Sequence, residues 1–103
     1  MKTLESIRSD LKEIRYYYSR KKVFDEAKVI TGKINSIESK ANTYNLAAQN
    51  ASPKLYDLYY SLYVQSHTQE SLAEALGYTP EYIQMLHKQL LLFLQSTMQA
   101  GGD

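Results

Sequence analysis

Polar side chains gather on one side of residues 79–88 when this segment is drawn as a helix. With Ile83 at 0° and about 100° between residues, the apolar side chains within about 80° of it are Leu86, Leu90, Phe93 and Leu94. The opposite side presents Glu81, Gln84, Met85 and Lys88, and Thr79 stands at the start. Gln pairs with adenine, Glu accepts from cytosine, Thr and Met meet the thymine methyl, and Lys reaches guanine or phosphate. These five residues are candidates for reading base edges in the major groove of DNA, although any solvated helix also presents Glu, Gln and Lys.

A reading helix of this kind needs a second helix that crosses it closely, with a small residue, a turn glycine and apolar contact points. The stretch "QESLAEALGYTPEYIQML" offers Ala73 as the small residue and Gly77 for a left-handed turn. Thr68 and Thr79 are N-cap residues, and Pro80 opens the second helix. The apolar points are filled by Leu72, Leu76, Tyr78, Ile83 and Leu86. We predict a helix-turn-helix with helices over 69–76 and 80–98; an ordinary helical hairpin without a ligand is the alternative.

The chain before this motif is also patterned for helices. "QNASP" at 49–53 is a break, with Ser52 as N-cap and Pro53 as the first residue of the next helix. That helix carries Leu and Tyr side chains across about 200° of its surface, so we expect it at the centre of the fold. Upstream, two apolar stripes keep 3-4 spacing, and their phase slips between Tyr18 and Val23. Residues 3–49 form either one long bent helix or two helices that meet near 19–23.

Both upstream stripes need apolar cover. Thr3 caps the first, which contains Leu4, Ile7, Leu11, Ile14 and Tyr18; the second contains Val23, Ala27, Ile30, Ile34, Ile37, Ala41, Tyr44 and Ala48. Two leucines of the last helix raise the same difficulty, because Leu91 and Leu92 fall near 80° and 180° from Ile83. Adjacent exposed leucines would form an unusual apolar patch on a small domain. We predict a symmetric homodimer in which the second copy covers, at least in part, Leu4, Ile7, Leu11, Ile14, Leu91 and Leu92.

The two parts of the chain differ in charge. Residues 1–40 hold ten Lys or Arg against six Asp or Glu, a net +4, and residues 41–103 hold two against five, a net −3. The helix-turn-helix lies in the acidic part, although phosphate neutralisation supplies much of the affinity for DNA. The basic part can fold beside the motif and contact phosphates, with Arg20, Lys21 and Lys22 as candidates. The alternatives are that this cluster is a solvated face and that the motif binds protein.

Composition narrows the class of protein. The chain has 103 residues, 44% of them hydrophobic, and is rich in helix-forming Ala, Leu, Glu, Lys and Gln. There is no cysteine, and His67 and His87 lack an obvious third metal ligand, so we expect them at the surface or near a cap. No apolar run approaches the roughly 20 residues of a membrane span, and the first residues do not resemble a signal peptide. There is no nucleophile elbow or Gly-rich phosphate loop. We expect a cytoplasmic protein without cofactor, metal or catalysis.

The sequence resembles two groups of regulators. "HTQESLAEALGYTPEYIQMLHKQLLLFL" resembles the promoter-reading region four of bacterial sigma factors, over roughly residues 53–95. "EIRYYYSRKKVFDEAKVITGK", "LYDLYYSLY" and "TQESLAEALGYTPEYIQ" resemble small phage and prophage proteins of Gram-positive bacteria, grouped with the ArpU and RinA type of late-gene regulators. The resemblance implies a helical DNA-binding regulator of phage genes, with base contacts from Thr79, Glu81, Gln84 and Lys88. The chain departs in charge, because sigma recognition helices are usually richer in Arg than "PEYIQMLHKQ".

We therefore predict an all-α fold. Residues 1–50 form a basic, coiled-coil-like segment, which is either one long helix or a helical hairpin. This segment packs on a helix-turn-helix over 51–98 that is similar to sigma factor region four. Residues 99–103 form a disordered tail. The predicted function is sequence-specific binding of double-stranded DNA in phage or prophage transcription control, inside the bacterial host cell. The alternatives are an adaptor that binds RNA polymerase or another phage or host protein, and a component of phage DNA packaging.

Overall fold

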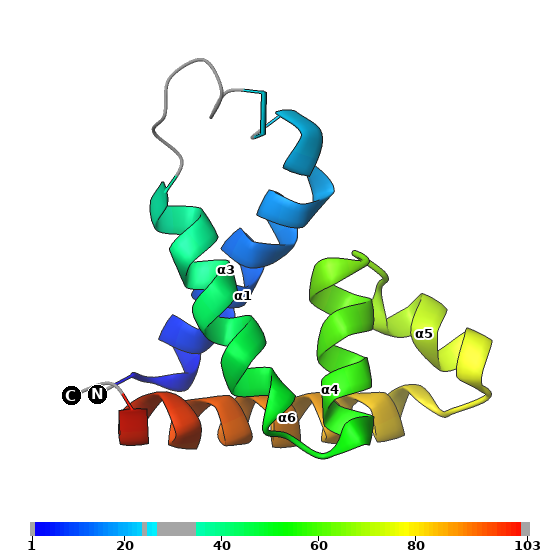
Figure 1. Cartoon of the computed structure of the whole chain (residues 1–103). Coiled ribbons are helices and arrows are strands. Elements are labelled where there is room, and N and C mark those ends of the chain that lie inside the picture. The colour runs from blue at the N-terminus through cyan, green and yellow to red at the C-terminus, as the bar shows by residue number, and fades with distance from the viewer. Residues whose placement is uncertain (1, 24, 27–34, 102–103) are drawn as a thin grey trace.

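The computed structural model describes residues 2–23, 25–26 and 35–101, and its regular elements are all helical. In chain order they are α1 (Leu4–Ser19), α3 (Asn35–Gln49), α4 (Pro53–Tyr59), the π-helix η1 (Tyr60–Val64), α5 (Gln69–Leu76) and α6 (Pro80–Gly101). α6 runs along the base of the molecule, α1 and α3 cross above it, and α5 lies beyond α4 and η1 (Figure 1). The predicted all-α fold is confirmed. α1 and α3 form an N-terminal hairpin, so the alternative of one long bent helix is wrong.

Local signals set the helix ends where the sequence predicts them. The Thr3 hydroxyl oxygen accepts a hydrogen bond from the Ser6 N–H at 3.0 Å, and Ser52 accepts from the Leu55 N–H at 3.4 Å, before Pro53. The predicted end of the last helix is wrong, because α6 continues to Gly101. The expected disordered tail is therefore helical over 99–101, and residues 102–103 lie outside the described residues.

One apolar core joins the N-terminal hairpin to the rest of the chain. Ile7, Leu11 and Ile14 are each 0% exposed, and α1 contacts α3, η1 and α6. On α3 the matching buried residues are Ala41, Tyr44, Ala47 and Ala48, and the three alanines let the two helices approach closely. The predicted interface role of Ile7, Leu11 and Ile14 is therefore corrected: the chain buries them itself, without a second copy. Leu4 packs partly buried against the same core.

Two further apolar residues depart from the sequence prediction. Leu91, expected off the core face of α6, is 1% exposed, because α6 packs against α1 and α3 as well as α4 and α5 and buries a wider arc than one neighbour would. Leu92 is 46% exposed and is the one exposed member of the predicted interface set. Val23, the first member of the second stripe, is 59% exposed rather than covered. Ala27, Ile30 and Ile34 lie outside the described residues.

The helix expected at the centre of the fold does lie there, but it changes pitch. Leu58, Tyr59, Leu62 and Tyr63 are buried, and α4 and η1 together contact α1, α3 and α6. At η1 the backbone widens to a π-helix, in which the Gln65 N–H reaches the Tyr60 carbonyl at 2.9 Å. The next residue, Ser66, has a φ of +61°, and its carbonyl accepts from Arg15 of α1 at 3.0 Å. This bond ties the loop before α5 to the N-terminal hairpin. The sequence did not predict the π-helix.

A buried carboxylate links α1 to α3. Asp10 is 7% exposed, and its oxygens accept hydrogen bonds from the Tyr44 hydroxyl at 2.6 Å and from Lys2 at 3.1 Å, with Lys40 also at 3.1 Å. Burial alone would raise the pKa of Asp10, but the hydrogen bonds from Tyr44, Lys40 and Lys2 outweigh it and lower the pKa. Burial and the bond to Asp10 raise the pKa of Tyr44. Asp10 is therefore ionised and fixes the register of the hairpin.

Candidate nucleic-acid interface

The turn between α5 and α6 has the geometry that the sequence predicts. Gly77 has a φ of +72°, in the left-handed region that favours glycine. The Gly77 N–H donates to the Glu74 carbonyl at 3.3 Å, and the Tyr78 N–H donates to the Ala73 carbonyl at 2.9 Å. These two bonds form a Schellman motif, which satisfies the last carbonyls of α5. The turn therefore ends α5 sharply and directs the chain into α6.

Both helices of the motif have strong N-terminal caps. Thr68 and Ser71 form a reciprocal capping box, in which each hydroxyl oxygen accepts the other residue's backbone N–H, at 3.0 and 3.2 Å. The Thr79 hydroxyl oxygen accepts the Tyr82 N–H at 3.1 Å, and Pro80 is the first residue of α6. The predicted caps at Thr68 and Thr79 are confirmed. Thr79 therefore has a structural role, which leaves its hydroxyl hydrogen, one oxygen lone pair and its methyl for contact with a ligand.

The crossing of α5 and α6 is packed through small and apolar residues. Ala73 is 3% exposed and Ile83 is 1% exposed, so the small residue does sit where the helices meet. On the side toward α4, Lys54 donates to the Tyr82 hydroxyl at 2.8 Å and also lies 5.4 Å from the centre of its ring. Two of the predicted contact points are only partly covered: Leu76 is 54% exposed, and Tyr78 is 38% exposed although its ring packs edge-on against the Tyr82 ring. These two side chains stand at the edge of the motif.

The reading face of α6, formed by Glu81, Gln84, Met85 and Lys88, is exposed as the helical wheel predicts. Opposite it, Ile83, Leu86, Leu90 and Leu94 are buried. No hydrogen bond or ion pair engages these four side chains in the part of the chain that the structure describes. Their polar groups are therefore available to a ligand. Around them, α5 and α6 carry Glu70, Glu74 and Glu81 against Lys88, so the motif itself is acidic.

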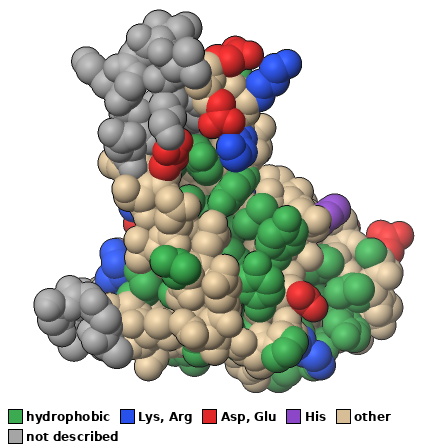
Figure 2. Space-filling model, viewed as in Figure 1, with side chains coloured by type: hydrophobic (Ala, Val, Ile, Leu, Met, Phe, Trp, Pro, Cys, Tyr) green, Lys and Arg blue, Asp and Glu red, His purple; other side chains and the backbone are tan. Residues whose placement is uncertain are grey.

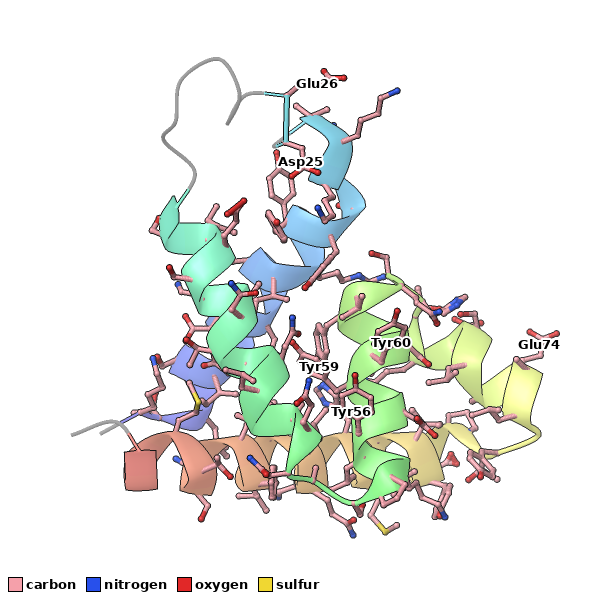
Figure 3. The ribbon with its side chains drawn as sticks, viewed as in Figure 1. Asp25, Glu26, Tyr56, Tyr59, Tyr60 and Glu74 are labelled. Carbon is pink, nitrogen blue, oxygen red and sulfur yellow. The ribbon has the colours of Figure 1, made fainter. Side chains whose placement is uncertain are left out.

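The basic trio Arg20, Lys21 and Lys22 is exposed but lies apart from the reading face. It follows the end of α1 at the top of Figure 1, whereas the turn into α6 lies at the lower right. Lys21 pairs with Asp25 at 2.9 Å, and Arg20 lies 5.7 Å from the centre of the Tyr16 ring. Asp25 offsets part of the charge of the trio, and Figure 3 labels it and Glu26 just beyond the end of α1. The basic part does pack on α6 through α1, but within a single copy the trio itself lies at the far end of α1 from the turn into α6.

Another arginine of the basic part lies nearer to α6. Arg8 of α1 is exposed, and its charge acts on both Tyr63 of η1 and His87 of α6. Arg15 lies about two turns further along the same face of α1. Its charge acts on Tyr63 as well, but its side chain donates a hydrogen bond to the Ser66 carbonyl. The sequence prediction missed Arg8, because the sequence shows a basic residue but not the packing of α1 against η1 and α6. Arg8 therefore lies near the buried side of α6, opposite the reading face.

His87 has neither the surface nor the capping role expected for it. Its ring is half-buried and is hydrogen-bonded to the Tyr63 hydroxyl, between η1 and α6. Burial lowers the pKa of His87, and the nearby charge of Arg8 lowers it further; burial also raises the pKa of Tyr63 to about 12. His67 is exposed. His87 is therefore neutral at pH 7 and belongs to the packing beneath the reading helix.

The lowered pKa of His87 predicts a stability that depends on pH. Above the usual His pKa of about 6.5 the ring is neutral in both folded and unfolded chains, so stability is full. As the pH falls below about 6.5, the unfolded chain binds a proton first, and the free energy of unfolding should fall by at most about 1.4 kcal/mol per pH unit. Denaturant unfolding at a series of pH values measures this slope. His87→Gln should remove it, whereas His67→Gln should leave it; an unchanged slope in His87→Gln would contradict the assignment.

Comparisons with protein families, curated proteins and solved structures find no match for this chain. Nowhere in residues 2–23, 25–26 and 35–101 do three His, Cys, Asp or Glu side chains come together as a metal site would require. No described helix combines the length and the apolar character needed to cross a membrane.

Proposed function

We propose that the chain is a non-catalytic protein that binds double-stranded DNA and reads base edges with the reading face of α6. The observation that carries the proposal is the geometry of the motif: a capped α5, a left-handed glycine turn and a capped α6 whose outer polar side chains have no partner within the described chain. Helices of this kind enter the major groove with their first turns. Glu81, Gln84, Met85 and Lys88 lie in those turns, and Thr79 caps the start of the helix.

The charge of the motif limits what α6 can do alone. Lys88 is the one Lys or Arg among the described residues of α5 and α6. Further phosphate contacts must therefore come from another element of the chain or from a second copy. Arg8 supports the first route, since α1 packs on α6. The exposed Leu92 on the same outer side of α6 supports the second, a homodimer, which sedimentation of the wild-type chain at micromolar concentration measures. The proposed setting, transcription control of phage or prophage genes in the bacterial cytoplasm, rests on the resemblance of the quoted segments.

A second function is favoured by one observation. The surface next to α5 is acidic and carries the exposed Leu76 and Tyr78, which suits a protein partner better than DNA. An adaptor that binds RNA polymerase or another phage or host protein is therefore the alternative. Mobility shift of phage promoter fragments at two salt concentrations separates the two functions. Failure to shift any fragment at either salt concentration would favour the adaptor.

The salt dependence of binding should identify the cations that meet phosphates. Arg8→Ala should reduce affinity for every duplex and reduce the slope of log K against log salt by about 0.9, because one phosphate contact is lost. The triple variant Arg20→Ala, Lys21→Ala, Lys22→Ala removes more charge from a place farther from α6. If the trio is a solvated face, the slope of the triple variant stays that of the wild type. A larger loss of slope in the triple variant than in Arg8→Ala would return the phosphate contacts to the trio.

A further inference from the structure

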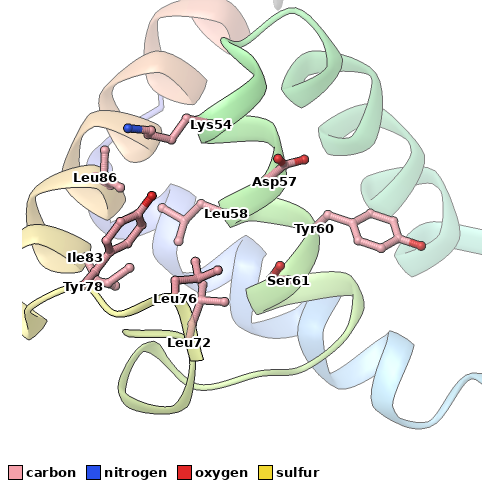
Figure 4. Close-up of a pocket in the computed structure, with 10 residues that line it drawn as sticks. All are labelled: Lys54, Asp57, Leu58, Tyr60, Ser61, Leu72, Leu76, Tyr78, Ile83 and Leu86. Atoms are coloured by element: carbon pink, nitrogen blue, oxygen red, sulfur yellow. The ribbon is translucent and has the colours of Figure 1, made fainter. Parts of the chain in front are cut away.

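The structure places a cation of α4, Lys54, against one exposed flank of the reading helix. Its Nζ donates to the Tyr82 hydroxyl at 2.8 Å and lies 5.4 Å from the centre of the Tyr82 ring. Lys54 is exposed at the start of α4, and Tyr82 is partly buried in the first turn of α6. In Figure 4 the Lys54 side chain extends toward α6 from the edge of the apolar pocket between α4, α5 and α6.

Tyr82 lies at the border between the reading face of α6 and its buried side. With Ile83 at 0°, Tyr82 falls at about −100°. Met85 of the reading face falls at about −160°, and the buried Leu86 falls at about −60°. The major groove of DNA is about 12 Å wide, and a helix with its side chains is about 10–12 Å across. A helix that enters the groove therefore has a phosphate strand along each flank, and Lys54 with Tyr82 stands on one of them.

The pair has hydrogen-bond donors that the described chain does not use. The Tyr82 oxygen accepts from Lys54, so the hydroxyl hydrogen is free to donate, and it has no acceptor among the described residues. A lysine ammonium group carries three N–H donors, of which Tyr82 takes one. Lys and Tyr are among the side chains that contact phosphate oxygens in protein–DNA complexes.

The Tyr82 side chain is held in place before a ligand arrives. Its ring packs edge-on against the Tyr78 ring, with the ring centres 4.9 Å apart and 77° between their planes. Its backbone N–H donates to the Thr79 hydroxyl oxygen at 3.1 Å, which fixes the first turn of α6. An ordered site loses less conformational freedom when it binds, so its contacts contribute more to affinity.

Lys54 is unfavourably placed for α4 itself. Because α4 begins at Pro53, Lys54 is near the positive end of the helix dipole, where an acidic side chain would be favoured. Its contact with Tyr82 is exposed, and such contacts stabilise a fold only weakly. Departures from local preference that bring little stability are expected at functional sites. The position of Lys54 therefore favours a role in binding.

Two acidic residues close in sequence do not occupy this flank. Asp57, one turn along α4, points away from α6 in Figure 4. Glu81 belongs to the reading face, at about 160° from Ile83. Figure 2 shows basic and acidic side chains among hydrophobic ones at the lower right, where α4 begins in Figure 1. The positive charge is therefore local, which suits a single phosphate group rather than a broad polyanion.

We propose that Lys54 and the Tyr82 hydroxyl together bind one backbone phosphate of the duplex that α6 reads. The proposal rests on the DNA binding proposed above, and it names α4 as the element that supplies the charge that α5 and α6 lack. Lys54 neutralises the phosphate diester, and both side chains donate hydrogen bonds to its oxygens. One cation and one neutral hydroxyl are too few to hold a free phosphate ion, so the site acts only when α6 holds the duplex.

The salt dependence of duplex binding separates the two side chains. Lys54→Gln should weaken binding to every duplex and reduce the slope of log K against log salt by about 0.9, because one phosphate contact is lost. Lys54→Arg should keep the slope. Tyr82→Phe should weaken binding about fivefold at an unchanged slope, because it removes a neutral donor. None of these variants should change the preference between duplexes, since a phosphate carries no sequence information.

Matched variants on α1 serve as controls. Lys12→Gln makes the same change in net charge, and Tyr16→Phe removes the hydroxyl of an exposed tyrosine that also lies beside a cation, Arg20. Neither control should change the affinity or the slope. Circular dichroism checks that each variant is folded, and if Tyr82→Phe is not, the comparison of Lys54→Gln with Lys54→Arg and Lys12→Gln still decides.

The possible failures are distinguishable. If the wild type binds duplexes and Lys54→Gln keeps its slope, or Lys12→Gln loses as much slope, this proposal fails and the DNA binding of α6 stands. If the wild type binds no duplex, the proposed function fails and this site fails with it. Inorganic phosphate titrated into the ¹⁵N-labelled chain should shift the Tyr82 amide signal no more than chloride at the same ionic strength. A saturable shift would assign the pair to free anions and overturn the proposal.

Discussion

Replacing Gln84 and Lys88 together with alanine should weaken binding to a specific duplex by at least about tenfold, since each lost base contact costs about 1–3 kcal/mol. Both side chains are exposed and make no hydrogen bond or ion pair with other described residues. The free energy of unfolding should therefore stay within about 0.5 kcal/mol of the wild type. Mobility shift at fixed salt measures the affinity, and denaturant unfolding measures the stability.

A matched double variant separates a base contact from a general effect of charge. Lys12 and Gln49 are exposed on α1 and α3, away from α6's reading face, and their replacement with alanine makes the same changes in composition and net charge. This control should bind DNA like the wild type. If it loses as much affinity as the Gln84 and Lys88 variant, net charge explains the result. If the Gln84 and Lys88 variant binds normally, the outer face of α6 is not the DNA face.

The helix ends were predictable because their causes are local. A Thr or Ser hydroxyl reaches a backbone N–H only three residues away, as at Thr3, Ser52 and Thr68, so the sequence alone carries the signal. Gly77 was predictable for the same reason, since its left-handed backbone depends on the residue itself. The exposed side of α6 followed from helical geometry once Ile83 was placed in the core.

The elements that bury each apolar stripe could not be predicted, because burial depends on which helices pack against one another. Leu91 looks exposed when α6 has neighbours on one side only, and it is buried because α6 packs on helices from both parts of the chain. The same packing covers Ile7 and Ile14, for which a second copy was expected. For the basic trio, the sequence gives the charge but not the position. The fold places the trio at the far end of α1 from the turn into α6.

Polar groups with partners distant in sequence were also missed. Tyr63 and His87 are 24 residues apart, and Asp10 and Tyr44 are 34 residues apart, so neither pair follows from spacing. In the sequence Asp10 looks like one more charge on a solvated helix face. Only the approach of α1 to α3 makes it a buried carboxylate with three donors.

Asp10→Ala should lower the free energy of unfolding by about 2–3 kcal/mol. Lys2 and Lys40 contribute little to this loss, because their side chains are 38% and 33% exposed and can turn to water. Most of it should come from Tyr44, which is 1% exposed and would lose the acceptor of its hydroxyl. An unsatisfied buried hydroxyl costs about 1–3 kcal/mol. Asp57→Ala, which removes an exposed aspartate without a partner among the described residues, is the matched control and should change stability by less than about 0.5 kcal/mol.

A double-mutant cycle with Tyr44→Phe tests this cause directly. Removing the Tyr44 hydroxyl in the wild-type background deletes one donor to Asp10 and should cost about 1 kcal/mol. In the Asp10→Ala background the same change deletes a hydroxyl that has lost its acceptor, so it should cost nothing or restore stability. The double variant should therefore be more stable than the sum of the single losses implies, by about 1 kcal/mol or more. Additive losses would show that Asp10 acts through Lys2 and Lys40 instead, and that the hairpin is held by charge at its surface rather than by the buried bond to Tyr44.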